Sequence, residues 1–168
     1  DCELSRGLGD VYKRQDIAKA KGARVVAGVS TEEKAKICRD YNVDDVVIYG
    51  DGPKDKDESK AFANELKSKS THGGYSIIYD PIGDCYAEPA FRSIGWKGRY
   101  LVVGFAAGHI PKLPINLTLL KGASLVGVFW GSFTVHEPEM NQRNIADINK
   151  MLTEGNIKPL ISKTFPME

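Results

Sequence analysis

The sequence predicts an α/β domain built on a doubly wound parallel β-sheet, and three observations lead to that prediction. Five short runs rich in Val, Ile, Leu and Tyr recur along the chain, nearly continuous instead of alternating, as in strands covered on both faces. Helix-patterned stretches separate these runs. The 168 residues, 42% hydrophobic and 27% charged, suit one domain and leave no room for two of ordinary size.

The expected strands follow one another at intervals suited to β-α-β units. Right-handed crossovers between such strands place helices on both faces of the sheet. Ligands then bind at the carboxyl ends of the strands, near the point where the strand order reverses. The predicted strands cover residues 24–29, 45–49, 75–79, 99–104 and 124–129.

Capping signals and apolar stripes define the helices. Ser30 and Glu33 have the spacing of a capping box, in which side chain and backbone satisfy each other at a helix start. Near the carboxyl end, Ile145, Ile148 and Leu152 form a stripe on one helical face. The expected helices cover residues 34–41, 57–70 and the two stretches that begin at Asp84 and Pro138 and end at Gly95 and Gly155.

Composition excludes several classes of protein. Lys plus Arg number 23 and Asp plus Glu 22, so the net charge of +1 provides no field for collecting nucleic acid, and the charge-dense stretch 51–60 is most simply a solvated loop and helix start. No apolar run approaches the roughly 20 residues of a membrane helix, and no signal peptide is recognisable, which favours a cytoplasmic protein with no membrane partner. The three cysteines include no C-x-x-C pair, so neither a disulfide framework nor a zinc site is indicated, and Cys38 and Cys85 are expected to be small core residues on helices.

The two ends of the sequence do not fit the pattern. Residues 1–15 match neither a strand nor an amphipathic helix, and 10–15 resembles the translation of a transposase adaptor used in sequencing libraries. We therefore expect residues 1–15 to be non-native and 16–168 to be the domain, incomplete at both ends. The Gly7-Leu8-Gly9 run is discarded as a dinucleotide fingerprint because Tyr12 replaces the third glycine and no strand is expected before it.

Several motifs in one order carry a resemblance to a known family, and they cover residues 17–27, 30–34, 46–49, 79–84, 98–106, 114–121 and 127–131. The sequence from residue 16 to 168 resembles the cofactor-binding domain of the zinc-free, zeta-crystallin-like quinone oxidoreductase branch of the medium-chain dehydrogenases/reductases. The resemblance implies a Rossmann-type sheet with strand order 3-2-1-4-5-6, from which the first strand and the Gly-rich loop are missing. The sheet would then have a gap beside the strand at 24–29, and the chain alone would be unstable and bind NADPH weakly.

The end of the predicted strand at 24–29 indicates which dinucleotide is bound. An acidic residue at this point favours NAD, because a carboxylate accepts from the ribose 2'-hydroxyl and repels a 2'-phosphate. No acid is present at the tip, where Ser30 can donate to a phosphate and Lys34 supplies positive charge one turn later. The alternative is that Ser30 only caps a helix and Lys34 only pairs with Glu33. The resemblance implies that Ser30 and Lys34 bind NADPH.

The resemblance also implies further cofactor contacts, all at strand ends. Read from the residues alone, the alternative for the Asp-Pro and Gly-Phe-Ala segments is an ordinary turn, and the alternative for the aromatic pair is buried core, which is compatible with a position near the cofactor. No general acid, base, nucleophile or metal ligand is identified, since the three histidines are scattered in expected loops. The further cofactor residues that the resemblance implies are Tyr49, Asp80, Pro81, Gly104, Phe105, Ala106, Phe129 and Trp130.

The function that the resemblance implies belongs to a longer parent protein. That parent would be a homodimeric, NADPH-dependent oxidoreductase passing hydride to a small quinone or α,β-unsaturated carbonyl. In such a protein the cofactor carries the chemistry and the chain supplies orientation and a dry site. The alternative is a non-catalytic NADPH-binding sensor or structural protein with RNA binding, which a stripe of exposed Lys and Arg leading away from the cofactor site would favour.

Overall fold

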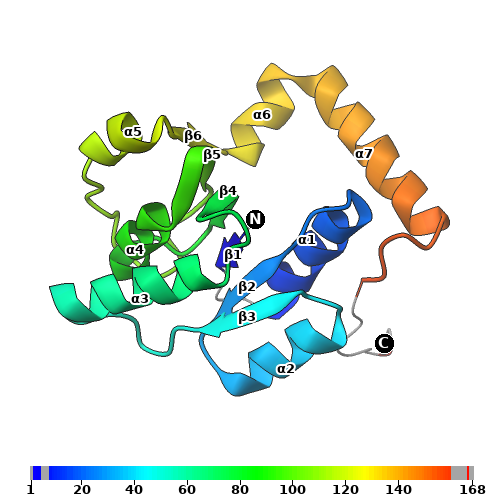
Figure 1. Cartoon of the computed structure of the whole chain (residues 1–168). Helices are drawn as coiled ribbons and strands as arrows, with labels where there is room; N and C mark the ends of the chain where they lie inside the picture. Colours follow the sequence, from blue (N-terminus) through cyan, green and yellow to red (C-terminus); the bar gives the residue numbers. More distant parts are fainter. Residues whose placement is uncertain (1, 5–7, 160–165, 167–168) are drawn as a thin grey trace.

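The computed structural model describes residues 2–4, 8–159 and 166, and its centre is a six-stranded sheet with helices on both sides (Figure 1). The strand order is β3-β2-β1-β4-β5-β6, and every neighbouring pair is parallel. The predicted α/β fold class and doubly wound order are confirmed. The strands are β1 (Cys2–Leu4), β2 (Val26–Val29), β3 (Asp45–Ile48), β4 (Tyr75–Asp80), β5 (Ile94–Val102) and β6 (Ser124–Gly127).

The predicted gap in the sheet is wrong, because β1 occupies the central position. Cys2 and Glu3 pair with Val26 and Ala27 of β2 on one side and with Ile78 and Tyr79 of β4 on the other. Ladder hydrogen bonds are made by backbone groups, so a short extended segment of almost any sequence can fill a central slot that would otherwise leave two edges unpaired. The predicted instability of the chain was based on this gap, and that reason therefore does not hold.

The first helix corrects a second expectation about the amino-terminal segment. α1 (Leu8–Ala20) begins well before residue 16, so residues 2–4 and 8–15 do adopt strand and helix, although α1 has no apolar stripe. Its Arg14 guanidinium lies 3.9 Å from the centre of the Tyr79 ring, a cation–π contact that holds α1 against β4. Whether residues 1–15 are native stays a prediction.

The remaining helices agree with the predicted ones in position and differ at their ends. α2 starts one residue later than the capping box implies, since its N-cap is Thr31, whose hydroxyl accepts from the Lys34 amide at 3.4 Å. α5 and α6 were not predicted, and α4 stops before Ser93, so that Gly95 lies within β5. The helices are α2 (Glu32–Asp40), α3 (Lys56–Ser68), the short 3-10 turn η1 (Asp84–Tyr86), α4 (Ala87–Arg92), α5 (Asn116–Lys121), α6 (Trp130–His136) and α7 (Pro138–Thr153).

Two hydrophobic clusters hold the helices on the sheet. The larger joins side chains of β4 and β5 to α3, η1 and α4, with Leu66, Tyr86 and Phe91 almost fully buried at its centre. The smaller joins β2 to α2 through residues that include Cys38. Cys38 is a core residue as predicted, but the prediction for Cys85 is wrong, because it lies in η1 with its side chain exposed. Burial on both faces explains the continuous apolar run of β2, whereas the expectation of such burial is wrong for β6, which is exposed at all four positions.

The last two helices leave the body of the domain. Figure 1 shows α6 and α7 rising from β6 and arching over toward α1, and neither helix has a buried residue. The predicted stripe of Ile145, Ile148 and Leu152 exists, but these side chains are 39–49% exposed. After α7 the chain returns to α1, where the Lys158 amide donates to an Asp16 carboxylate oxygen at 2.9 Å. Among the described helices, none is both long and apolar enough to span a bilayer.

Candidate functional site

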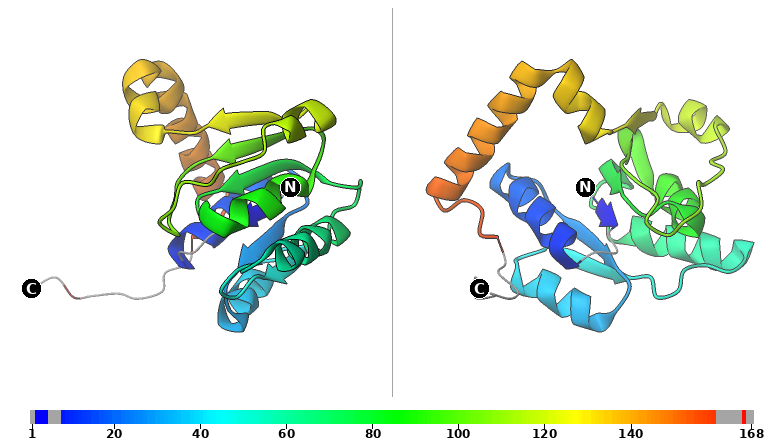
Figure 2. Two further views of the ribbon diagram at one scale, coloured as in Figure 1. Left: turned by 90° about the vertical axis from the view of Figure 1, so that its left-hand side faces the viewer. Right: turned by 180° about the vertical axis from the view of Figure 1, so that it is seen from behind.

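The carboxyl ends of the parallel strands meet at one edge of the sheet. Figure 2 shows the strands stacked with their arrows pointing the same way. Each residue predicted to bind the cofactor follows one of these strands or ends it. The candidate site is therefore built from strand ends far apart in sequence, as expected for a doubly wound sheet.

Ser30 and Lys34 form a direct pair at the end of β2. The Lys34 ammonium donates to the Ser30 hydroxyl oxygen at 2.8 Å, and both side chains are half-buried. Because Thr31 caps α2, the alternative in which Ser30 is the helix cap is wrong. The residue after β2 and the first turn of α2 thus present a hydroxyl and a cation together beside an amide-rich helix start, a combination that suits a phosphate group.

The Asp80 side chain is buried and accepts hydrogen bonds from neighbouring groups. Its side chain, at the end of β4, is 2% exposed. One carboxylate oxygen accepts from the Ile82 and Gly83 amides at 2.8 and 3.0 Å, and the other accepts a short hydrogen bond from the Tyr100 hydroxyl. These three donors compensate the cost of burying the charge. Asp80 therefore shapes the turn after β4, and a direct contact with a cofactor stays a prediction.

The turns after β4 and β5 are joined by backbone hydrogen bonds. The Ala106 amide donates to the Pro81 carbonyl and the Ala107 amide to the Ile82 carbonyl, both at 3.0 Å. Gly104 fits because an added Cβ would lie 3.3 Å from the Pro81 carbonyl oxygen. The Pro81 and Gly104 to Ala106 segments thus form one rigid wall at the carboxyl edge.

Gly83 allows the turns after β4 and β5 to pack closely against each other. Its φ is +70°, which L-residues with a side chain rarely adopt, and an added Cβ would lie 2.8 Å from the Phe105 ring. Phe105 therefore packs against the Gly83 backbone, and its ring is 39% exposed. The exposed part of the ring is available to cover a ligand lying on the strand ends.

Three aromatic residues predicted at the site have different environments. Phe129 and Trp130 are 76% and 69% exposed, and Trp130 starts α6 instead of ending a strand. The competing interpretation of this pair as buried core does not fit that exposure. Tyr49 is buried, with its ring centre 4.8 Å from that of Tyr86 and 6.5 Å from that of Phe62. Tyr49 thus packs in the core next to the carboxyl edge of the sheet, and its contact with a cofactor stays a prediction.

One residue of the site was missed by the sequence analysis. Tyr100 lies on β5, twenty residues from the Asp80 carboxylate that it binds, and no local pattern distinguishes it from other apolar strand residues. No group of three or more His, Cys, Asp or Glu side chains that could hold a metal occurs in the described part of the chain. Of the three histidines, His109 has an acidic neighbour, with its Nδ1 3.2 Å from an Asp84 oxygen.

Comparisons with known proteins assign this chain to a family. Residues 15–148 match the family described as zinc-binding dehydrogenase. The chain is 30% identical over 146 residues to quinone oxidoreductase-like protein 2 of Bos taurus, covering 87% of this chain and 40% of that protein. It is 28% identical over 153 residues to acryloyl-coenzyme A reductase of Sulfurisphaera tokodaii, covering 90% of this chain and 39% of that one.

A solved structure agrees with these sequence matches. A mycobacterial protein determined in complex with NADPH superimposes with a TM-score of 0.79 and 25% identity, covering 94% of this chain and 47% of that one. The same protein in its native form is described as a quinone oxidoreductase. The chain thus spans less than half the length of these relatives. It belongs to the zinc-binding dehydrogenase family of medium-chain dehydrogenases/reductases, on its quinone oxidoreductase-like branch.

Proposed function

We propose that this chain is the cofactor-binding domain of an NADPH-dependent reductase whose acceptor is a quinone or an α,β-unsaturated carbonyl compound. The Ser30–Lys34 pair at the end of β2 carries the proposal. A hydroxyl and an ammonium held 2.8 Å apart, with no carboxylate at the strand tip, favour a ribose 2'-phosphate over a free 2'-hydroxyl.

The other strand ends provide what a dinucleotide needs along the edge. NADPH would supply the hydride from its nicotinamide ring. The braced turns after β4 and β5 hold backbone groups in fixed positions, which favours orientation of a bound ring without loss of entropy at the moment of reaction. The exposed Phe105 ring at this edge can exclude water from one side of that position.

The two named relatives support a reductase, and they differ in acceptor. One is described as quinone oxidoreductase-like and the other as a reductase of acryloyl-coenzyme A, whose double bond is conjugated to a thioester. Both acceptors take hydride at an electron-poor carbon conjugated to a carbonyl. We therefore propose this electronic class of acceptor and not one member of it.

Replacing Lys34 by Gln tests the cofactor assignment. Loss of the cation facing the 2'-phosphate is expected to raise the Kd for NADPH about tenfold, or about 1.4 kcal/mol, and to leave the Kd for NADH within about twofold. Nucleotide fluorescence titrations of the 168-residue chain measure both constants. Lys36→Gln, an exposed change on the same helix, is the control. Equal losses for NADPH and NADH, or a loss in the control, would contradict the assignment.

Turnover tests the acceptor class. A polypeptide that contains this chain and has the full length of its relatives, prepared without zinc, is expected to oxidise NADPH when a quinone or an enone is added. The readout is the decay of NADPH absorbance with each acceptor and with a saturated ketone as the negative control. Absence of turnover with every quinone and enone, despite NADPH binding, would reject the reductase and favour the non-catalytic sensor.

We also propose that the parent is a homodimer that pairs through β6. This strand lies at the end of the sheet, paired on one side to β5, and Leu125 and Val126 are 40% and 37% exposed. An exposed apolar edge strand is an aggregation hazard unless it is paired or covered, and pairing with a second copy about a two-fold axis would satisfy it.

A further inference from the structure

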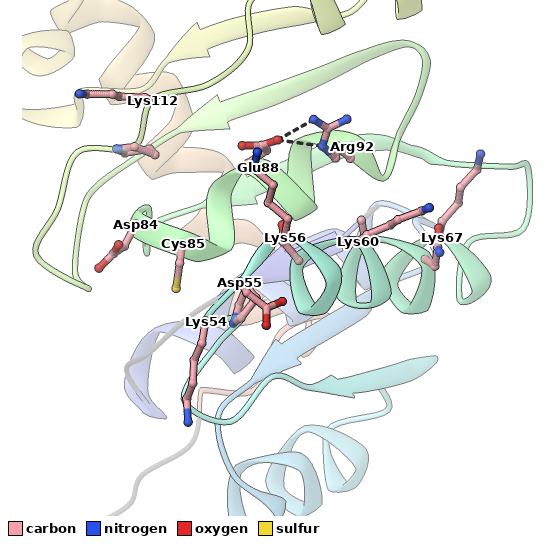
Figure 3. A pocket seen from close by; sticks show the side chains of 15 residues that line it. Lys54, Asp55, Lys56, Lys60, Lys67, Asp84, Cys85, Glu88, Arg92 and Lys112 are labelled. Atoms are coloured by element: carbon pink, nitrogen blue, oxygen red, sulfur yellow. Dashed lines mark hydrogen bonds and ion pairs between the residues drawn. The ribbon is translucent and has the colours of Figure 1, made fainter.

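An open groove of about 830 Å³ lies between α3 and the η1–α4 segment. Figure 3 shows α3 as one wall and α4 as the other, with charged side chains along both. None of the ten residues predicted to bind the cofactor lines the groove. Its volume is within the range of sites that take small molecules.

The lining of this groove is strongly basic, although the whole chain is almost neutral. Three carboxylates stand against six cations, and one carboxylate, Glu88, is already paired with Arg92 at 2.6 Å. Asp55 is engaged as the α3 cap, accepting from two backbone amides at 2.8 and 2.9 Å. Since the net charge of the chain is only +1, positive charge is concentrated here. The six cations are Lys54, Lys56, Lys60, Lys67, Arg92 and Lys112.

The helix itself arranges three of these cations in a row. At about 100° per residue, Lys56, Lys60 and Lys67 fall within about 40° of one another around α3, whereas Glu58 and Glu65 lie on the opposite side. With a rise of about 1.5 Å per residue, the row extends about 16 Å along the groove. All three lysines are exposed. An elongated ligand with several negative charges would match this spacing.

The cations of the row are not neutralised by the protein. In the described part of the chain, no carboxylate oxygen lies within 4 Å of the ammonium groups of Lys56, Lys60 or Lys67. Burial lowers the pKa of Lys121, as do the nearby positive charges of Lys67 and Arg92, and its ammonium donates to the carbonyl oxygens of Arg92 and Ile94. The three ammonium groups of the row are therefore available to a negatively charged ligand.

We propose that the groove between α3 and α4 binds a small polyanion that carries two or more linked phosphate groups. Lysine ammonium groups act as point charges, which suit phosphates arranged in a chain better than a single planar carboxylate. Ser59 and Asn64 on the same wall add neutral hydrogen-bonding groups. The proposal concerns a site separate from that of NADPH.

The same row of lysines is what a nucleic-acid-binding alternative predicts, but the lining argues against it. Proteins that hold single strands stack bases on exposed aromatic rings, and the lining of this groove contains no aromatic residue. The ligand class favoured by the lining is therefore defined by phosphates and not by bases.

Calorimetric titration of the 168-residue chain with sodium tripolyphosphate tests the proposal. The wild-type chain is expected to bind one tripolyphosphate, with affinity falling as salt is added. The triple variant Lys56→Gln, Lys60→Gln, Lys67→Gln is expected to lose at least about tenfold in affinity, or about 1.4 kcal/mol. The charge-matched control changes the exposed Lys21, Lys36 and Lys97 to Gln and is expected to stay within about twofold. Circular dichroism confirms that both variants retain helix content.

Competition separates this site from the cofactor site and identifies the source of the phosphates. Saturating NADPH is expected to leave the tripolyphosphate affinity unchanged. Equal binding of tripolyphosphate and ATP would show that phosphates suffice, and tighter binding of ATP would show that a nucleoside also contributes; both results support the proposal. No binding, an equal loss in the control variant, or displacement by NADPH would overturn it. So would an oligouridylate that outcompetes tripolyphosphate at equal phosphate concentration.

Discussion

Replacing Asp80 by Ala is expected to destabilise the domain by about 3–5 kcal/mol, a large part of the 5–15 kcal/mol typical of a whole domain. The change removes the acceptor for the Ile82 and Gly83 amides and for the Tyr100 hydroxyl. Each buried donor left without a partner costs about 1–3 kcal/mol. Urea unfolding of the variant and the wild type, followed by circular dichroism, measures the difference in free energy of unfolding.

Two matched variants show whether the carboxylate acts through these three donors. Asp80→Asn keeps an oxygen for the two amides, so we expect a loss of about 1–2 kcal/mol. Tyr100→Phe leaves one carboxylate oxygen without its donor, with a loss in the same range. If Asp80 instead served only to contact a cofactor, Asp80→Ala would weaken NADPH binding while the unfolding midpoint stayed that of the wild type. That result would exclude the bracing role.

The sequence predicts the sheet well because burial on both faces leaves a record in composition. A strand such as Val26–Val29, which is buried at all four positions, has room only for apolar residues and glycine, and its sequence consists of Val, Ala and Gly. The order of the strands is implied by the family resemblance, and right-handed crossovers restrict the topologies open to alternating strands and helices. Composition and chain order therefore suffice for the fold class.

The central strand could not be predicted in this way. Cys2–Leu4 has three residues, one of them charged, and is held by backbone pairing with β2 and β4. Pairing of this kind uses groups that every residue possesses, so it leaves no mark on residue type. Its presence also removes one of the two reasons for discarding Gly7-Leu8-Gly9, because a strand does precede it, although Tyr12 still replaces the third glycine.

In the candidate site, too, some features could be predicted from the sequence and others could not. Spacing alone could not choose between Ser30 and Thr31 as the cap of α2, and this one-residue difference decides whether the Ser30 hydroxyl is bound to the helix or to Lys34. The role of Tyr100 depends on a contact between two strands. The basic groove depends on the approach of α3 to α4, so a stretch that reads as a solvated loop and helix start contributes one wall of a binding site. Local patterns thus locate strand ends, and tertiary contacts assign their roles.

Gln15→Leu is expected to stabilise the domain by about 1–3 kcal/mol. The Gln15 side chain lies in α1 with no exposed surface, and neither its amide nitrogen nor its oxygen has a hydrogen-bond partner among the described residues. Burying an amide without partners costs about this much, whereas Leu has nearly the same volume and no polar atom to satisfy. The midpoint and slope of urea unfolding, compared with those of the wild type, measure the gain.

The same substitution at an exposed helical position separates desolvation from helix propensity. Gln142→Leu lies on α7, where the side chain is exposed, and should change the free energy of unfolding by less than about 0.5 kcal/mol. Gln15 belongs to residues 1–15, whose non-native origin stays a prediction. A wild-type stability higher than that of Gln15→Leu would mean that the Gln15 amide is satisfied in the folded chain.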